Sequence, residues 1–160
     1  MHYPIDDCGR VVQYDPAMWR ELAERFYPDH EFRAGATGAA LNNAELRLGT
    51  ELPSDLRGLL AESDGITGEY GLGLVWPVAR IVDDNLSFRS NDEFRRLYMA
   101  FDQLLFFGDA GNGDQFAFRL VSVLWDTDIY VWNHEDDSRT WVAPGLGKYL
   151  EWWAEGRIKT

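Results

Sequence analysis

The sequence predicts an α+β fold: a single domain with a mainly antiparallel sheet of about five to six strands packed with four to five helices. Three observations lead to this prediction. Helical spacing of apolar residues dominates residues 19–65, short strand-like runs dominate residues 104–142, and a further helical stripe follows at 146–153. Helices and strands that are segregated along a chain are typical of α+β domains. A length of 160 residues is enough for one hydrophobic core but too little for two.

The first two helices are predicted from apolar spacing and from their end signals. Asp15 and Pro16 are suited to open a first helix, as a cap and as a first-turn residue whose missing N–H costs nothing. Its apolar stripe consists of Trp19, Leu22, Ala23 and Phe26. After a glycine-rich connector at 31–40, Thr37 is expected to cap a second helix that ends at Gly49.

The middle of the chain is predicted to contain two further helices and a short strand. Ser54 is expected to cap a third helix that ends near Gly65. Residues 71–82, GLGLVWPVARIV, are interpreted as a short strand broken at Pro77, because proline cannot donate to a sheet ladder. Asn91 is expected to cap a fourth helix. The buried face of that helix is predicted to consist of Phe94, Leu97, Tyr98 and Phe101.

The second half of the chain contains strand-like runs at 104–107, 115–120, 129–132 and 140–142. The loop in FFGDAGNGDQFAF, residues 106–118, could hold a metal, cradle a phosphate or turn the chain. Asp109 is followed by Ala110 and a glycine, so the ligand series of a calcium loop fails, and a phosphate loop would need a lysine and a following helix. Gly111 and Gly113 instead favour a hairpin connection, with no metal and no cofactor.

No catalytic residues are predicted. The histidines lie far apart in the sequence, at His2, His30 and His134. Ser138 near His134 could belong to a hydrolytic triad, and Asp126 with Asp128 could serve a metal or acid-base chemistry, but both pairs are more typical of solvated turns and strand ends. We therefore expect a protein that is not an enzyme. A small hydrolase or metal-dependent enzyme built from dispersed acids is the alternative that only convergent side chains would support.

Charge and composition narrow the partner classes. The net charge of −12 disfavours direct nucleic-acid binding. No apolar run is long enough to cross a membrane and the start of the chain lacks a signal-peptide pattern, so a cytoplasmic protein is expected.

Cys8 is the single cysteine and is interpreted as an inert surface thiol. Residues 102–137 hold eight acids and one base, Arg119, a net charge of −7 that serves either solubility or the binding of a basic partner.

One stretch resembles a known family. Residues 41–65, LNNAELRLGTELPSDLRGLLAESDG, are similar to the SUKH superfamily, the Smi/Knr-type proteins. The matching positions are Glu45, Leu48-Gly49, Leu52-Pro53, Asp55, Leu59-Leu60 and Asp64-Gly65. Asp64 replaces the usual Asn, and Leu56 stands where an aromatic is common. The later runs LLFFGDAGNGDQFAF, IYVWNHED and LGKYLEWW also resemble the family. We expect one SUKH-like domain over 1–160, with the resemblance at about 38–155 and an N-terminal helix and connector at 1–37.

The resemblance implies a SUKH fold and a non-enzymatic role. Many bacterial members resemble immunity proteins that neutralise a toxin, often a nuclease, of a polymorphic or contact-dependent system by direct binding. The alternative is an intracellular regulatory or scaffold module of the Smi/Knr type. We expect a protein partner, a basic toxin domain, and a monomer as the default state. Charge clustering, not the family, selects the candidate contacts, with Trp125 as an apolar anchor: Trp125, Asp126, Asp128, Glu135, Asp136 and Asp137.

Overall fold

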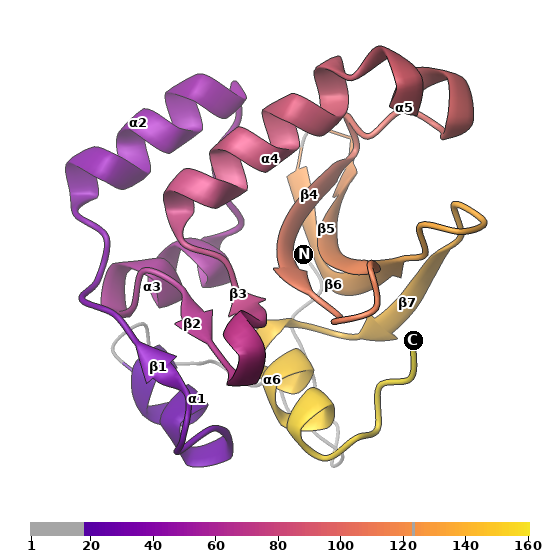
Figure 1. Ribbon diagram of the computed structural model, residues 1–160. Coiled ribbons are helices and arrows are strands. Elements are labelled where there is room, and N and C mark those ends of the chain that lie inside the picture. The colour runs from indigo at the N-terminus through magenta and orange to yellow at the C-terminus, as the bar shows by residue number, and fades with distance from the viewer. Residues whose placement is uncertain (1–17, 123) are drawn as a thin grey trace.

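The computed structural model describes residues 18–122 and 124–160, and it confirms the α+β class (Figure 1). The helices in this part of the chain are α1 (Trp19–Phe26), α2 (Gly38–Leu48), α3 (Ser54–Glu62), α4 (Val78–Ser90), α5 (Asp92–Leu97) and α6 (Leu146–Ala154), with a 3-10 turn η1 (Glu69–Gly71). The strands are β1 (Glu31–Phe32), β2 (Ile66–Thr67), β3 (Gly73–Val75), β4 (Leu104–Asp109), β5 (Gln115–Val121), β6 (Leu124–Trp132) and β7 (Arg139–Ala143). No helix in the described residues is both long and apolar enough to cross a lipid bilayer.

All strand pairs in the described part of the chain are antiparallel, and the strands divide into two sheets. The smaller sheet has the order β1-β2-β3 and the larger one the order β4-β5-β6-β7. Described residues thus contain six helices and seven strands, where four to five helices and one sheet of five to six strands were expected. The strands of the smaller sheet have only two or three residues each, too short to leave a clear alternating pattern in the sequence.

Helix α4 is the main correction to the sequence-based interpretation. The broken strand expected over residues 71–82 was right only for β3, because the chain beyond Pro77 forms a 13-residue helix. Pro77 occupies the N-cap position, where a missing N–H is no loss. The backbone N–H of Val78 donates to the Asp64 carboxylate at 2.7 Å, so a side chain from the segment between α3 and β2 caps the helix.

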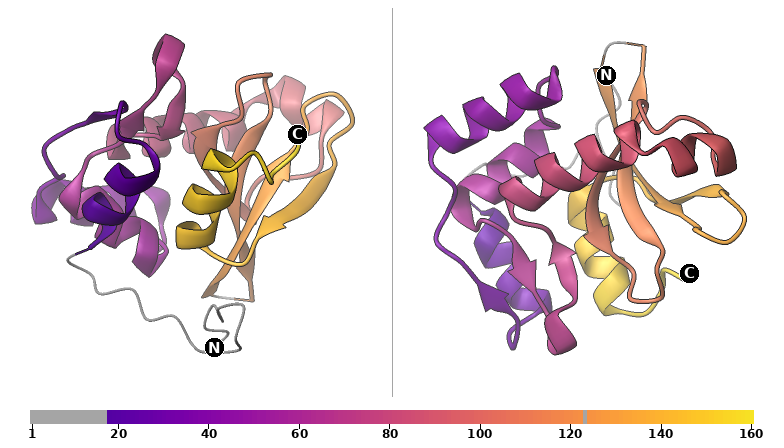
Figure 2. Two further views of the ribbon diagram at one scale, coloured as in Figure 1. Left: turned by 90° about the horizontal axis from the view of Figure 1, so that it is seen from below. Right: turned by 45° about the horizontal axis from the view of Figure 1, so that its top comes forward.

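The larger sheet is covered on both faces. Phe106 and Phe107 are neighbours in β4, so their side chains point to opposite faces. The ring of Phe106 lies 5.4 Å from Phe88 of α4, and the ring of Phe107 lies 5.2 Å from Tyr149 of α6. Helix α4 therefore packs on one face and α6 on the other, and the two views in Figure 2 show the sheet between them.

The two sheets are joined at β3 and β4. Trp76 donates its backbone N–H to the Phe107 carbonyl at 2.7 Å, and the Tyr149 hydroxyl donates to the Leu74 carbonyl at 2.8 Å. At Gly108 a Cβ atom would lie 2.5 Å from the carbonyl oxygen of Leu74, so only glycine permits this approach. One hydrophobic core consequently extends from α1 to the C-terminal segment.

Several expected end signals are confirmed. The Thr37 side chain accepts from the backbone of Ala40, and Gly49 ends α2 with φ 72°. Asn91 accepts from the next turn of α5 at 2.9 and 3.1 Å. The loop after β4 is the predicted hairpin connection, with Gly111 at φ 93° and Gly113 at φ 98°.

Two local expectations were wrong, and some fall outside the described residues. Pro53, not Ser54, is the N-cap residue of α3. Leu97 was expected on a buried face but is 69% exposed, because α5 ends at Leu97 and the chain continues extended at Tyr98. The apolar stripe of α1 is confirmed by the burial of its members. The expected cap of that helix, Asp15 with Pro16, lies outside the described residues, as do His2 and Cys8.

Candidate protein-binding surfaces

The six candidate contact residues do not form one patch. Trp125, Asp126 and Asp128 lie near the start of β6, whereas the other three lie in the β6–β7 turn, residues 133–138, beyond its end. A strand rises by about 3.3 Å per residue, so Asp126 and Trp132 are separated by about 20 Å along β6. The structure therefore divides the predicted acidic surface into two groups at opposite ends of the strand.

The group at the start of β6 is held by internal contacts. The indole of Trp125 donates to the backbone carbonyl of Glu51 at 2.7 Å and ties the β5–β6 hairpin to the segment between α2 and α3. Asp126, Asp128 and Tyr130 alternate along the strand and so share a face. Arg119 from β5 lies 3.7 Å from the Asp126 carboxylate and 4.7 Å from the centre of the Tyr130 ring.

Ionisation at Tyr130 reflects this environment. Burial raises the pKa of Tyr130, the nearby Arg119 opposes that rise, and Asp128 and Asp126 add to it. A cation among two carboxylates lowers the negative potential that this face presents to a partner.

In the β6–β7 turn, Asp137 has a structural role. It adopts φ 61° and accepts hydrogen bonds from the Met99 backbone at 2.8 Å and the Trp132 indole at 2.8 Å. Its carboxylate also lies 3.4 Å from Arg139, and only 14% of its side chain is exposed. These bonds fasten the turn to the segment that follows α5.

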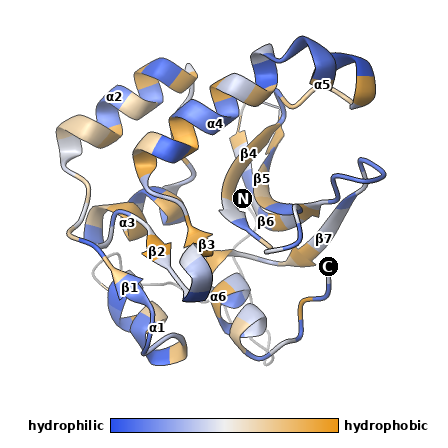
Figure 3. Cartoon of the chain, in the orientation of Figure 1, coloured by the Kyte–Doolittle hydropathy of each residue, from blue (hydrophilic) through white to orange (hydrophobic). Residues whose placement is uncertain are grey.

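Glu135 and Asp136 present their side chains to solvent. The backbone N–H of Glu135 is bound by Asn133 at 2.8 Å, which fixes the turn, and both acids are exposed. Hydrogen bonds from Ser138 lower the pKa of Asp136 and so favour its ionised carboxylate. The turn is strongly hydrophilic in Figure 3, where it projects at the right of the molecule.

Two apolar side chains are exposed at the end of α5 and just after it, in the segment that is bonded to the β6–β7 turn. Leu97 at the end of α5 is 69% exposed, and Met99 is 62% exposed. Tyr98 between them is anchored, because its hydroxyl donates to the His134 carbonyl at 3.0 Å. Exposed apolar side chains on a rigid segment bordered by carboxylates have the composition of a small protein interface. We call Leu97, Met99, Glu135 and Asp136 the turn surface.

The acids of the glycine loop serve the fold. Asp109 accepts two hydrogen bonds from Arg80 at 3.0 Å each, and Arg80 stacks on the Trp76 ring at 4.0 Å. Asp114 is buried and lies 2.7 Å from the Nδ1 atom of His134. No group of three or more metal-ligating side chains occurs among residues 18–122 and 124–160.

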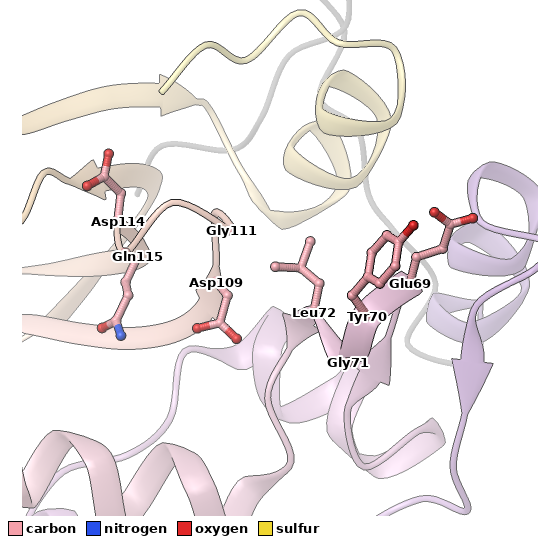
Figure 4. Close-up of a pocket in the computed structure, with 9 residues that line it drawn as sticks. Glu69, Tyr70, Gly71, Leu72, Asp109, Gly111, Asp114 and Gln115 are labelled. Atoms are coloured by element: carbon pink, nitrogen blue, oxygen red, sulfur yellow. The ribbon is translucent and has the colours of Figure 1, made fainter.

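Sequence reasoning missed a projecting turn between β2 and β3. Residues 68–72, which we call the tongue, carry Tyr70 as a fully exposed side chain. A hollow of about 480 Å³ separates the tongue from the β4–β5 loop, and Figure 4 shows Leu72 pointing from the tongue toward the loop that carries Asp109 and Gly111. The signal was an aromatic residue between two glycines, Gly68 and Gly71, in a stretch between the third predicted helix and the strand predicted from residue 71, to which the sequence analysis assigned no structure.

A comparison with models of protein families matches most of this chain to a family. The SUKH_6 model, described as SMI1-KNR4 cell-wall, matches residues 39–150, which is more than half of the chain. These limits agree closely with the resemblance at 38–155 in the sequence. No curated protein matches the chain.

Proposed function

This chain belongs to the SUKH_6 family, described as SMI1-KNR4 cell-wall, and we propose that it is a non-enzymatic immunity protein of a bacterial polymorphic or contact-dependent toxin system. It neutralises a cognate toxin, for which a nuclease is the candidate class, by direct binding in the cytoplasm. Family membership and the net charge of −12 support a basic protein partner, since opposite charge accelerates and orients association.

The observation that carries this proposal is the turn surface. Hydrogen bonds from Met99 and Trp132 to Asp137 hold the turn and the end of α5 together, so the exposed apolar and acidic groups need little ordering when a partner binds. Of the six contacts selected from the sequence, Glu135 and Asp136 are the strongest candidates because they are exposed. Asp126, Asp128 and Trp125 remain candidates for a second contact.

The direct test is co-expression with a toxin gene found beside the gene for this protein. Growth rescue together with a co-purifying complex supports immunity. Co-purification of a host enzyme, with no toxin gene in the neighbourhood and no rescue, would instead support the alternative of a Smi/Knr-type regulatory module. Turnover of any substrate by the purified chain would contradict the non-enzymatic part of the proposal.

The turn surface is tested by association kinetics with the purified toxin. The double variant E135K/D136K should slow association, most strongly at low salt, because salt screens charges that lie more than about 10 Å apart. The control E21K likewise replaces an exposed acid by lysine, but on α1, outside the turn surface. The Glu21 side chain lies 4.0 Å from Arg25. Equal association rates for wild type and the double variant across salt concentrations would remove the turn surface from the interface.

A further inference from the structure

The tongue holds one aromatic side chain rigidly in solvent. The backbone N–H of Gly68 donates to the Leu72 carbonyl at 2.8 Å, and the N–H of Leu72 donates to the Glu69 carbonyl at 3.1 Å. These bonds close the turn, and Tyr70 at its tip has φ 57° and a fully exposed side chain. The turn stands out from the body of the molecule, at the top of the left view in Figure 2. A tyrosine offers a large contact area with few rotatable bonds, so binding through it costs little side-chain entropy.

Hollows lie on both sides of Tyr70. The first, about 480 Å³, lies between the tongue and the β4–β5 loop. The second, about 420 Å³, lies between the tongue and the end of α1, where Phe26, Asp29 and His30 form its far wall. Glu69, Tyr70 and Leu72 line both hollows, so the tongue is a ridge between two concave surfaces. A partner that straddles the ridge would bury the ring of Tyr70 on both of its faces.

The charge of these hollows is of one sign. Four carboxylates line them, at Asp29, Glu69, Asp109 and Asp114, and no lysine or arginine is among the lining residues. In Figure 4 Asp109 and Asp114 lie on the opposite side of the first hollow from Tyr70 and Glu69, and the carboxylate of Asp114, which is bonded to His134, points away from Tyr70. Asp109 is neutralised by Arg80, but Asp29 and Glu69 have no ion pair within 4.0 Å in the described part of the chain.

His30 does not compensate these two acids at neutral pH. Burial lowers the pKa of His30, and the smaller opposing effects of Glu69 and Asp29 do not reverse that direction. The imidazole is therefore mostly neutral at pH 7, and the second hollow carries uncompensated negative charge. A cationic group is the complement that such a surface lacks.

We infer that the tongue is the docking point for an arginine side chain presented by a basic segment of the protein partner. The guanidinium would stack on the ring of Tyr70 and pair with the carboxylate of Glu69, while the aliphatic stem would lie against Leu72. Arginine fits better than lysine, because its planar group both stacks on aromatic rings and binds carboxylates through two donors. The inference rests on the proposed function only in taking the partner to be a basic protein.

The tongue differs from the six contacts selected by charge clustering. The only aromatic residue among those six, Trp125, is partly buried and bonded to Glu51. At the tongue, an exposed ring, a carboxylate that forms no ion pair with residues 18–122 or 124–160, and two adjoining hollows occur together. The tongue is also formed by the β2–β3 connection rather than by β6, so substitutions can separate the two surfaces.

The test needs no toxin. A blocked Gly-Gly-Arg-Gly-Gly peptide is titrated into the ¹⁵N-labelled full chain, in parallel with the same peptide carrying citrulline, the uncharged isostere of arginine. We expect amide shifts concentrated at residues 68–72, 29–30 and 109–115, with the citrulline peptide binding several-fold more weakly. Shifts concentrated at residues 133–138, spread evenly over the acidic surface, or equal for the two peptides would each overturn the inference.

Variants make the assignment specific to the ring and the carboxylate. Y70N removes the ring and tolerates the left-handed backbone at this position, so it should fold and bind the arginine peptide about two- to fivefold more weakly. Y70F should bind like wild type, and E69Q should lose affinity. The control E93Q removes one exposed carboxylate on α5, outside both binding surfaces, and should leave peptide affinity unchanged. A loss equal to that of E69Q would show that the peptide responds only to net charge.

This outcome is separable from that of the proposed function. If a toxin that the wild-type protein neutralises binds the Y70N variant with unchanged affinity, the tongue is not the docking point and the immunity proposal stands. If no toxin is found but the arginine peptide binds at the tongue, the docking inference stands and the immunity proposal fails.

Discussion

Replacing Asn85 by leucine should destabilise the protein strongly, although the change is from a polar to an apolar residue in the core. Asn85 on α4 is 1% exposed, and its amide oxygen accepts from the Phe106 backbone N–H at 2.9 Å. Its amide nitrogen donates to the carbonyls of Phe106 at 2.8 Å and Ile81 at 2.7 Å. Phe106 lies in the edge strand β4, where its backbone N–H and C=O face away from β5. The Asn85 side chain takes the place of a neighbouring strand by bonding both of these groups.

The expected magnitude follows from the groups left unpaired. N85L leaves a buried N–H and a buried C=O of Phe106 without partners, at about 1–3 kcal/mol for each group. Additional apolar burial by leucine offsets part of this cost, so we expect a loss of about 2–4 kcal/mol in the free energy of unfolding. For a domain of this size, the loss corresponds to a midpoint of thermal unfolding lower by about 5–15 °C.

The assay is urea unfolding followed by far-UV circular dichroism, with hydrogen exchange of the Phe106 amide as a local probe. The control N43L makes the same replacement at an exposed position of α2 and should change the unfolding free energy by about 0.5 kcal/mol or less. A loss below about 0.5 kcal/mol for N85L at unchanged denaturant slope would refute the idea that this amide completes the edge of the sheet.

Three further predictions concern other positions. G108A should lower stability by about 1–3 kcal/mol because its Cβ would collide with the Leu74 carbonyl, whereas G38A, with open space around it, should be tolerated; thermal unfolding compares the two. D137N removes the charge that binds the Met99 backbone, so we expect faster hydrogen exchange at the Met99 amide; unchanged exchange would argue against fastening of the turn. Burial raises the pKa of Asp55, so protonation of this group favours folding, and that contribution to stability is lost as pH rises through the folded pKa. D55N should therefore be more stable than wild type at pH 7, and the urea midpoints of the two proteins should converge below pH 3.8.

Much of the fold could be predicted from local patterns. The caps at Thr37 and Asn91 and the left-handed end at Gly49 depend on contacts within one turn, which the sequence contains directly. The hairpin at Gly111 and Gly113 is equally local. The candidate site was harder to predict, because exposure of an acid depends on which distant groups bind it, and the assignment of contacts to a partner stays a prediction.

The sequence by itself determined the α+β class, the family and the negative charge, because spacing, motifs and composition do not depend on long-range packing. Only the tertiary structure decided that Pro77 begins a helix capped by Asp64, and that the Asp137 carboxylate accepts hydrogen bonds from Met99 and Trp132. It also decided that Tyr70 is exposed between two hollows. Each of these outcomes depends on groups brought together by folding or on the position of the segment relative to the core. A side chain's partners are set by that packing, and residue type alone does not specify them.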